Sequence, residues 1–167
     1  MMEKRNMKHR LKLISRELDK LSLAHAKVVE VLKPSDLRKL DFPLFLESVS
    51  AGFPSPADDY LEGRLDLNQH LINRPAATFF VRVTGDSMQG AGIYSGDLLI
   101  VDRSLEAKDN NIIIAVIDGE LTVKRLSKIN NKIFLLPENT NYEPIEITDQ
   151  MSFEVWGVVT NVIHSVI

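Results

Sequence analysis

The stretch Ile112–Leu126, "IIIAVIDGELTVKRL", decides the fold that the sequence predicts. Asp118-Gly119 stands between two runs of apolar and β-branched residues, which is the strongest short-range signal for a β-hairpin with a two-residue turn. Such a turn sets the register of the two strands, and it pairs Ile113 with Lys124. We therefore expect an antiparallel hairpin in which Lys124 lies on the same face as several apolar residues.

Further segments rich in β-forming residues lie on both sides of this hairpin, with turn residues between them. The chain has 167 residues, 44% of them hydrophobic, which is enough for one domain with its own core. We expect a mainly β, compact, strand-rich domain over residues 57–167, beginning with one or two short helices before Pro75. The expected strands outside the hairpin are Thr78–Val83, Asp97–Arg103, Lys132–Pro137 and Phe153–Ile163.

Two segments of different character precede this domain. Residues 1–31 form an N-terminal extension with apolar residues at helical spacing, typical of one short amphipathic helix or of a basic helix that binds DNA or a partner. Residues 32–56 contain four prolines, which remove backbone donors and favour extended conformations. We expect this second segment to be an extended arm.

The charge of the chain is unevenly distributed. Residues 1–33 contain nine Lys and Arg against four Asp and Glu, for a net charge of +5, whereas residues 34–167 carry −8. The acidic body is poorly suited to binding nucleic acid through phosphate contacts. Only the N-terminal part could bind DNA, and direct DNA binding stays open.

Other classes of protein are disfavoured by composition. The chain has no cysteine, so disulfides, thiolate nucleophiles and Cys-ligated zinc are excluded. It has no apolar run of about 18 residues and no signal-peptide pattern, so we expect a cytoplasmic protein without a membrane anchor. No cluster has metal-ligand spacing, and we expect neither a metal nor a cofactor.

The segment "VTGDSMQGAGI" (Val83–Ile93) leads a strand into a serine with glycines on both sides. A surface turn would explain these residues, because Gly, Asp and Ser are ordinary turn formers. The alternative is a nucleophile, for which the glycines would leave room for a peptide and for main-chain N–H groups that hold an oxyanion. The expected donors of that oxyanion hole are the main-chain groups of Asp86 and Ser87.

A nucleophilic serine needs a base, and the four histidines show no Ser-His-Asp order. A lysine among apolar neighbours loses hydration, which lowers its pKa, so Lys124 could serve as the base of a Ser–Lys pair. If the hairpin instead lies at an exposed edge, Lys124 reaches solvent and stays charged. The hairpin alone does not distinguish these two cases.

Taken in order, these motifs resemble the UmuD-like members of the LexA-like self-cleaving Ser–Lys peptidases, which act in the SOS response to DNA damage. The similarity runs over about residues 32–163, with the "GDSM" serine and the lysine of the "TVK" strand 37 positions apart. The resemblance implies a LexA/UmuD-type peptidase domain with Ser87 as nucleophile and Lys124 as general base. It also implies self-cleavage between Ala51 and Gly52, just before "FPSP". Small residues there would let an extended arm enter a cleft without steric clash.

The same resemblance implies a set of partners. A RecA filament on single-stranded DNA would promote self-cleavage, and the shortened homodimer would join a UmuC-like Y-family polymerase in error-prone translesion synthesis. The C-terminal strand is the expected dimer surface. The alternative is a small LexA-like SOS repressor in which residues 1–33 bind DNA and self-cleavage inactivates them. UmuD-like chains typically begin near Leu32, so residues 1–31 are either a genuine extension or the result of an early start codon.

Overall fold

The computed structural model describes residues 26–34, 41–45 and 61–167. These residues form mainly β-strands, as the sequence predicts, and the helices among them are short. The elements are β1 (Lys27–Leu32), β2 (Asp41–Phe45), β3 (Leu61–Asp66), α2 (Leu67–Leu71), β4 (Thr78–Thr84), the 3₁₀ turn η1 (Gln89–Ala91), β5 (Leu98–Asp102), β6 (Ile112–Ile117), β7 (Glu120–Ile129), β8 (Lys132–Leu136), β9 (Ile145–Ile147) and β10 (Phe153–Ile163).

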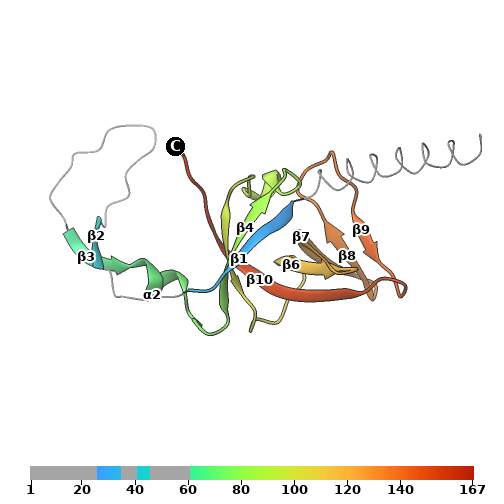
Figure 1. Cartoon of the computed structure of the whole chain (residues 1–167), viewed down its shortest axis with the longest axis horizontal. Helices are drawn as coiled ribbons and strands as arrows, with labels where there is room; N and C mark the ends of the chain where they lie inside the picture. The colour runs from blue at the N-terminus through green and yellow to red at the C-terminus, as the bar shows by residue number, and fades with distance from the viewer. Residues whose placement is uncertain (1–25, 35–40, 46–60) are drawn as a thin grey trace, which may run out of the picture.

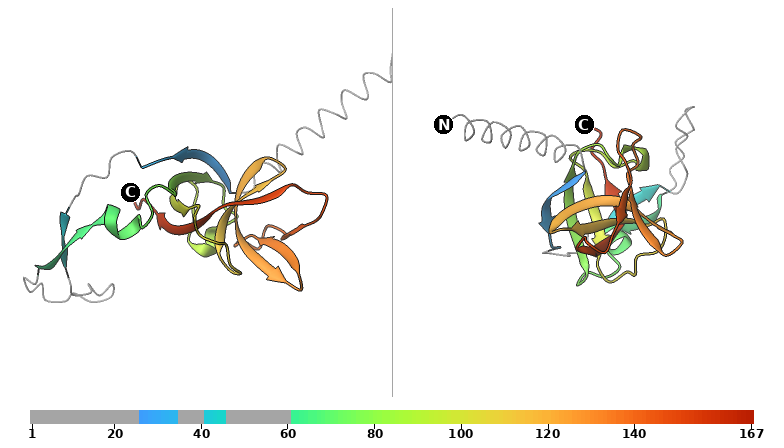
Figure 2. Two further views of the ribbon diagram at one scale, coloured as in Figure 1. Left: turned by 90° about the horizontal axis from the view of Figure 1, so that it is seen from below. Right: turned by 90° about the vertical axis from the view of Figure 1, so that its right-hand side faces the viewer.

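Eight strands form one antiparallel sheet in the order β1-β4-β5-β10-β6-β7-β8-β9. β1 also pairs with β7, through Lys27 and Thr122. The strands β1, β4, β5, β10, β6 and β7 therefore close into a ring, and β8 and β9 extend from β7. Figures 1 and 2 show the resulting strongly curled sheet, with β1 (blue) beside β4 (green). Bulges in the pairings of β1 and β10 add the local bending that such a curl requires. β2 and β3 form a separate two-stranded sheet, which Figure 1 places with α2 at one end of the molecule.

The β6–β7 hairpin has the predicted register. Ile113 pairs with Lys124, and the turn residues Asp118 and Gly119 have φ angles of 49° and 86°. Both lie in the left-handed region that a two-residue hairpin turn needs at both positions, which Asp-Gly tolerates well. The hairpin prediction is therefore confirmed, and so is the side of the strand on which Lys124 lies.

The two faces of this hairpin contribute to two different hydrophobic clusters. Ile114 and Val123 belong to the first cluster, which also contains Ala26. Ile113 and Leu126 belong to the second, as expected from the alternation of side chains along a strand. Because β6 and β7 are buried on both faces, the hairpin is central to the domain, which places Lys124 in its interior.

Two expectations about the elements before β4 are wrong. Residues 27–31, which we assigned to an extension with helical spacing, belong to β1, where a run rich in valine suits a strand and the edge of β4 supplies a partner. Residues 61–66, expected to be helical, form β3. Within the described part of this segment, α2 alone is a helix, and the carboxylate of Asp66 accepts hydrogen bonds from the N–H groups of Asn68 and Gln69. Residues 1–25 and most of the arm lie outside the described ranges. The three-part division of the chain stays a prediction.

Candidate active site

Ser87 lies in the turn that follows β4. Gly85 begins this turn with a φ of 92°, a conformation that suits glycine, and η1 follows directly after Met88. The turn directs the Ser87 side chain into the protein, where the residue is 0% exposed. It is therefore a buried polar residue rather than part of a surface turn.

Lys124 reaches the same place from β7. Its Nζ lies 3.0 Å from Ser87 Oγ, and it also donates to Thr122 Oγ1 at 3.2 Å and to the main-chain oxygen of Val123 at 3.0 Å. The residue is 1% exposed, and burial lowers the pKa of Lys124 from 10.5 to about 8. The sequence left open whether Lys124 is buried or reaches solvent, and in the structure it is buried. About one lysine in ten is then neutral at pH 7, and that fraction can accept a proton from the serine.

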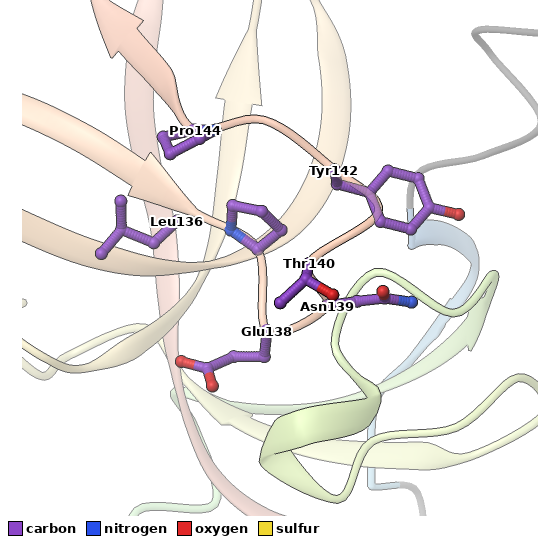
Figure 3. A pocket seen from close by; sticks show the side chains of 7 residues that line it. Leu136, Glu138, Asn139, Thr140, Tyr142 and Pro144 are labelled. Carbon is purple, nitrogen blue, oxygen red and sulfur yellow. The ribbon is translucent and has the colours of Figure 1, made fainter.

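The loop after β8, residues 137–144, binds the turn that carries Ser87. The side-chain amide of Asn139 donates to the main-chain oxygen of Asp86 at 3.1 Å, and the Tyr142 hydroxyl donates to the Asp86 carboxylate. This hydrogen bond raises the pKa of Tyr142 to about 12, because ionisation would remove the proton that the hydroxyl donates; burial and the negative charge of Asp86 act in the same direction. Figure 3 shows the pocket on this loop, with Asn139 and Tyr142 extending to one side and Glu138 to the other. Asn139 and Tyr142 were not predicted from the sequence, since they lie more than 50 positions after Asp86.

The main chain of the loop also binds the turn. Glu138 N–H donates to the oxygen of Ser87, and Gly90 N–H donates to the oxygen of Glu138, both at 2.7 Å. A Cβ at position 90 would lie 2.5 Å from that Glu138 oxygen, so only glycine permits this approach. We had expected the glycines to leave room for a peptide substrate, but at Gly90 the protein's own loop takes the space.

The main chain of Ala26, just before β1, also reaches the pair. Ala26 N–H donates to Ser87 Oγ at 3.0 Å, and its oxygen accepts from Val123 N–H at 3.3 Å and from the Thr122 hydroxyl at 3.2 Å. We assigned residues 1–31 no part in the site from the sequence, and we did not single out Thr122. Thr122 lies two residues before Lys124 on the same strand face, so period-two alternation could have identified it. Nothing in the local sequence marks Ala26.

The structure thus brings together two of the residues that the sequence singled out, Ser87 and Lys124. Asp86 is anchored in the same turn, and the oxyanion role of the Asp86 and Ser87 main chain stays a prediction. The expected cleavage site, Ala51 and Gly52, lies outside the described residues. None of the helices in the described ranges is long and apolar enough to cross a membrane.

A buried serine hydroxyl beside a lysine of lowered pKa, within a strand-rich domain, is an arrangement of the serine peptidase class. Comparison with known proteins agrees, because the Peptidase S24-like family matches residues 43–160. The chain is similar to the protein SamA of Salmonella typhimurium, with 52% identity over 73% of this chain and 84% of SamA. It is also similar to ImpA of Escherichia coli (48% identity, 73% and 83% of the two chains) and to MucA of the same organism (41%, 83% and 94%).

The chain therefore belongs to the Peptidase S24-like family of self-cleaving serine peptidases. The resemblance to UmuD-like proteins is confirmed by these relatives.

Gly90→Ala tests whether the loop after β8 positions the serine. The new Cβ would push the Glu138 main chain away and displace the turn, and a displacement of about 1 Å at a nucleophile can reduce a rate about 100-fold. We expect self-cleavage of the purified protein, followed by mass spectrometry, to slow at least about tenfold. The matched control is Gly92→Ala, which strains the backbone at a φ of 73° but meets no atom within 4 Å of the new Cβ, so it separates backbone strain from displacement of the loop. Equal rates for the two variants would contradict the positioning role.

Proposed function

We propose that the chain is an SOS-induced, self-processing subunit of an error-prone translesion DNA polymerase, with Ser87 and Lys124 as its catalytic pair. The observation that carries this proposal is the 3.0 Å contact between Lys124 Nζ and Ser87 Oγ in a buried setting. Burial favours the neutral amine, and only a neutral amine can act as a base. Membership of a family of self-cleaving peptidases supports the same assignment.

The reaction follows from the chemistry of the pair. Neutral Lys124 takes the proton of the Ser87 hydroxyl as Oγ forms a bond to the carbonyl carbon of Ala51. The main-chain N–H groups of Asp86 and Ser87 stabilise the negative oxygen of the tetrahedral intermediate. The Lys124 ammonium then returns the proton to the nitrogen of Gly52, and the Ala51–Gly52 bond breaks. Water hydrolyses the resulting ester by the same sequence of proton transfers.

The proposal includes two partners and a second copy of the chain. A RecA filament on single-stranded DNA favours the state in which the arm occupies the site, without supplying a catalytic group. The cleaved protein, a homodimer in the cytoplasm, then joins a UmuC-like Y-family polymerase. The end of the chain supports a dimer surface there, because several apolar side chains are exposed on it. They are Val162, Ile163, Val166 and Ile167.

Substitutions in the pair test the catalytic assignment. Ser87→Ala and Lys124→Ala should each abolish self-cleavage, because a nucleophile and its base act as a unit. Lys124→Arg should be equally inactive, since a guanidinium does not deprotonate in a protein. Mass spectrometry measures the loss of intact chain, and circular dichroism establishes that each variant is folded. The control is Lys132→Arg, at an exposed lysine, which should cleave at the parental rate. Cleavage by Lys124→Arg would contradict the general-base role.

The pKa of Lys124 predicts the pH dependence. Because burial lowers this pKa to about 8, the neutral fraction rises from about 9% at pH 7 to about 91% at pH 9. The initial rate of self-cleavage of the purified protein should therefore increase about tenfold over this range and level off above pH 9. A rate that stays flat between pH 7 and 9, while the protein remains folded, would rule out a lysine base with this pKa.

The products and their binding test the biological role. Cleavage should yield residues 1–51 and 52–167, and a RecA filament should increase its rate. An affinity-tagged Y-family polymerase should capture the 52–167 product and not Ser87→Ala, the uncleavable form. Salt-dependent binding of the intact chain to duplex DNA, without capture by the polymerase, would instead support the repressor alternative.

A further inference from the structure

The catalytic pair lies beside a strand edge that β1 already occupies. β7 pairs with β6 from Glu120 to Arg125, but with β8 only from Arg125 onward, so its first half has one edge left over. Lys27 pairs with Thr122 on that edge, and Val123 N–H donates to the oxygen of Ala26. The start of β1 thus binds as an added strand, which is how peptide segments commonly bind to a sheet edge.

The contact between Ala26 and Ser87 is a hydrogen bond from a peptide N–H to the serine oxygen. Ala26 N–H donates to Ser87 Oγ at 3.0 Å, so Oγ lies in the direction in which this N–H bond points. Because the peptide group is planar, that direction lies in its plane, whereas attack requires Oγ above a carbonyl carbon. The serine oxygen is therefore engaged with a peptide group that it is badly placed to cleave.

The hydrogen bonds around Lys124 fit an inactive pair. The Thr122 hydroxyl donates to the oxygen of Ala26, so towards Lys124 it acts as an acceptor. Ser87 Oγ and the oxygen of Val123 are the other two acceptors, which makes three for the three N–H bonds of an ammonium group. With Ala26 in place, the network accommodates a protonated lysine, which cannot act as a base.

We propose that Ala26–Leu32 is an internal pseudosubstrate that binds the catalytic cleft as an added strand and must leave before the Ala51–Gly52 segment can enter. This inference rests on the proposed function in taking that segment as the substrate. It assigns to β1 a role that the sequence analysis did not give it. It also fits the burial of Ser87 and Lys124 in this structure, since a site that is ready for substrate has to be accessible.

β1 is well suited to leave the sheet. Ala26 is buried, but Val29, Val31 and Leu32 are 55%, 39% and 44% exposed. The ion pair between Glu30 and Arg82 is long, at 3.5 Å, and about half exposed, so it stabilises the strand little. A strand with few buried side chains is expected to open locally without unfolding of the rest of the domain.

A reversible cross-link tests the inference in the full chain. The protein has no cysteine, and Glu30 and Arg82 are register partners on β1 and β4, at a spacing that a disulfide can bridge. In the double variant Glu30→Cys/Arg82→Cys, oxidation should hold β1 in place. We expect the oxidised form to cleave itself at least about tenfold more slowly than the reduced form, the change expected if release of β1 limits access. The single variant Glu30→Cys is the control, and reductant should leave its rate unchanged.

A second readout separates this inference from the proposed function. Labelling of Ser87 by a small serine-directed phosphonate requires an open cleft but not the arm, so it should also be slower in the oxidised form. Redox-dependent labelling without any cleavage at Ala51–Gly52 would support the pseudosubstrate and contradict the proposed substrate. If oxidation changes neither labelling nor cleavage, the pseudosubstrate is refuted, whatever happens at Ala51–Gly52.

A pair of substitutions tests the same point without a cross-link. Ala26→Trp places a large side chain where the residue is 1% exposed, and it should displace the segment. Val29→Trp, at an exposed position of the same strand, is the matched control. We expect the phosphonate to label Ser87 faster in Ala26→Trp than in the parent, and self-cleavage to be faster too, whereas Val29→Trp should behave like the parent. Both rates should increase about tenfold if β1 is docked in about nine-tenths of the parent molecules. Cleavage of the parent chain at a bond next to Ala26 would overturn the inference, because the segment would then be a substrate.

Discussion

The burial of one ammonium group is the constraint on which the site depends. Lys124 is almost completely enclosed, and its pKa of about 8 corresponds to about 3 kcal/mol lost by the charged form relative to a lysine in water. A side chain in such a place needs a rigid surrounding structure, because any opening would rehydrate it. The β6–β7 hairpin supplies this structure by lying between two hydrophobic clusters, and the Thr122 hydroxyl and the Val123 main chain bind Nζ. In this fold Lys124 is therefore charged in most molecules at pH 7, and it is neutral and able to act as a base in a minority of them.

The position of the serine is determined by contacts between segments far apart in the chain. The main-chain N–H of Glu138 donates to the main-chain oxygen of Ser87, and Asn139 binds the neighbouring residue Asp86. Lys124 and the main chain of Ala26 both donate to the Ser87 hydroxyl oxygen. The turn itself is short and contains glycine, so without these contacts it would have considerable conformational freedom. The geometry of the pair is thus a property of the closed sheet and of the loop after β8, and not of the "GDSM" motif alone.

Because the site depends on contacts between distant segments, only part of the fold and of the site could be predicted from the sequence. The hairpin register and the strands β4, β5, β8 and β10 follow from local patterns, because an Asp-Gly turn and alternating apolar residues act over a few positions. The short strand β9 was not predicted. β1 and β3 were mistaken for helical segments, since a strand is stabilised by a partner that local sequence does not reveal. The burial of Lys124 was undecided for the same reason, because it depends on what covers the hairpin. Ser87 and Lys124 were identified from residue chemistry and family resemblance, whereas Tyr142, Asn139 and Ala26 carry no local signal.

A peptidase that cleaves its own chain needs restraint, because its substrate is always present at high effective concentration. Here two restraints act on the same few atoms. Protonation of Lys124 leaves about one molecule in ten with a competent base at pH 7, and the proposed docking of Ala26 engages the serine hydroxyl. The two effects are not independent: the oxygens of Ser87, Thr122 and Val123 are acceptors for the ammonium group, whereas the burial found in the docked structure lowers the pKa of Lys124. A partner that favours the arm over β1 would remove one of these two restraints. It would increase the rate by changing which of two segments of the same chain lies on the edge of β7, without touching the catalytic atoms.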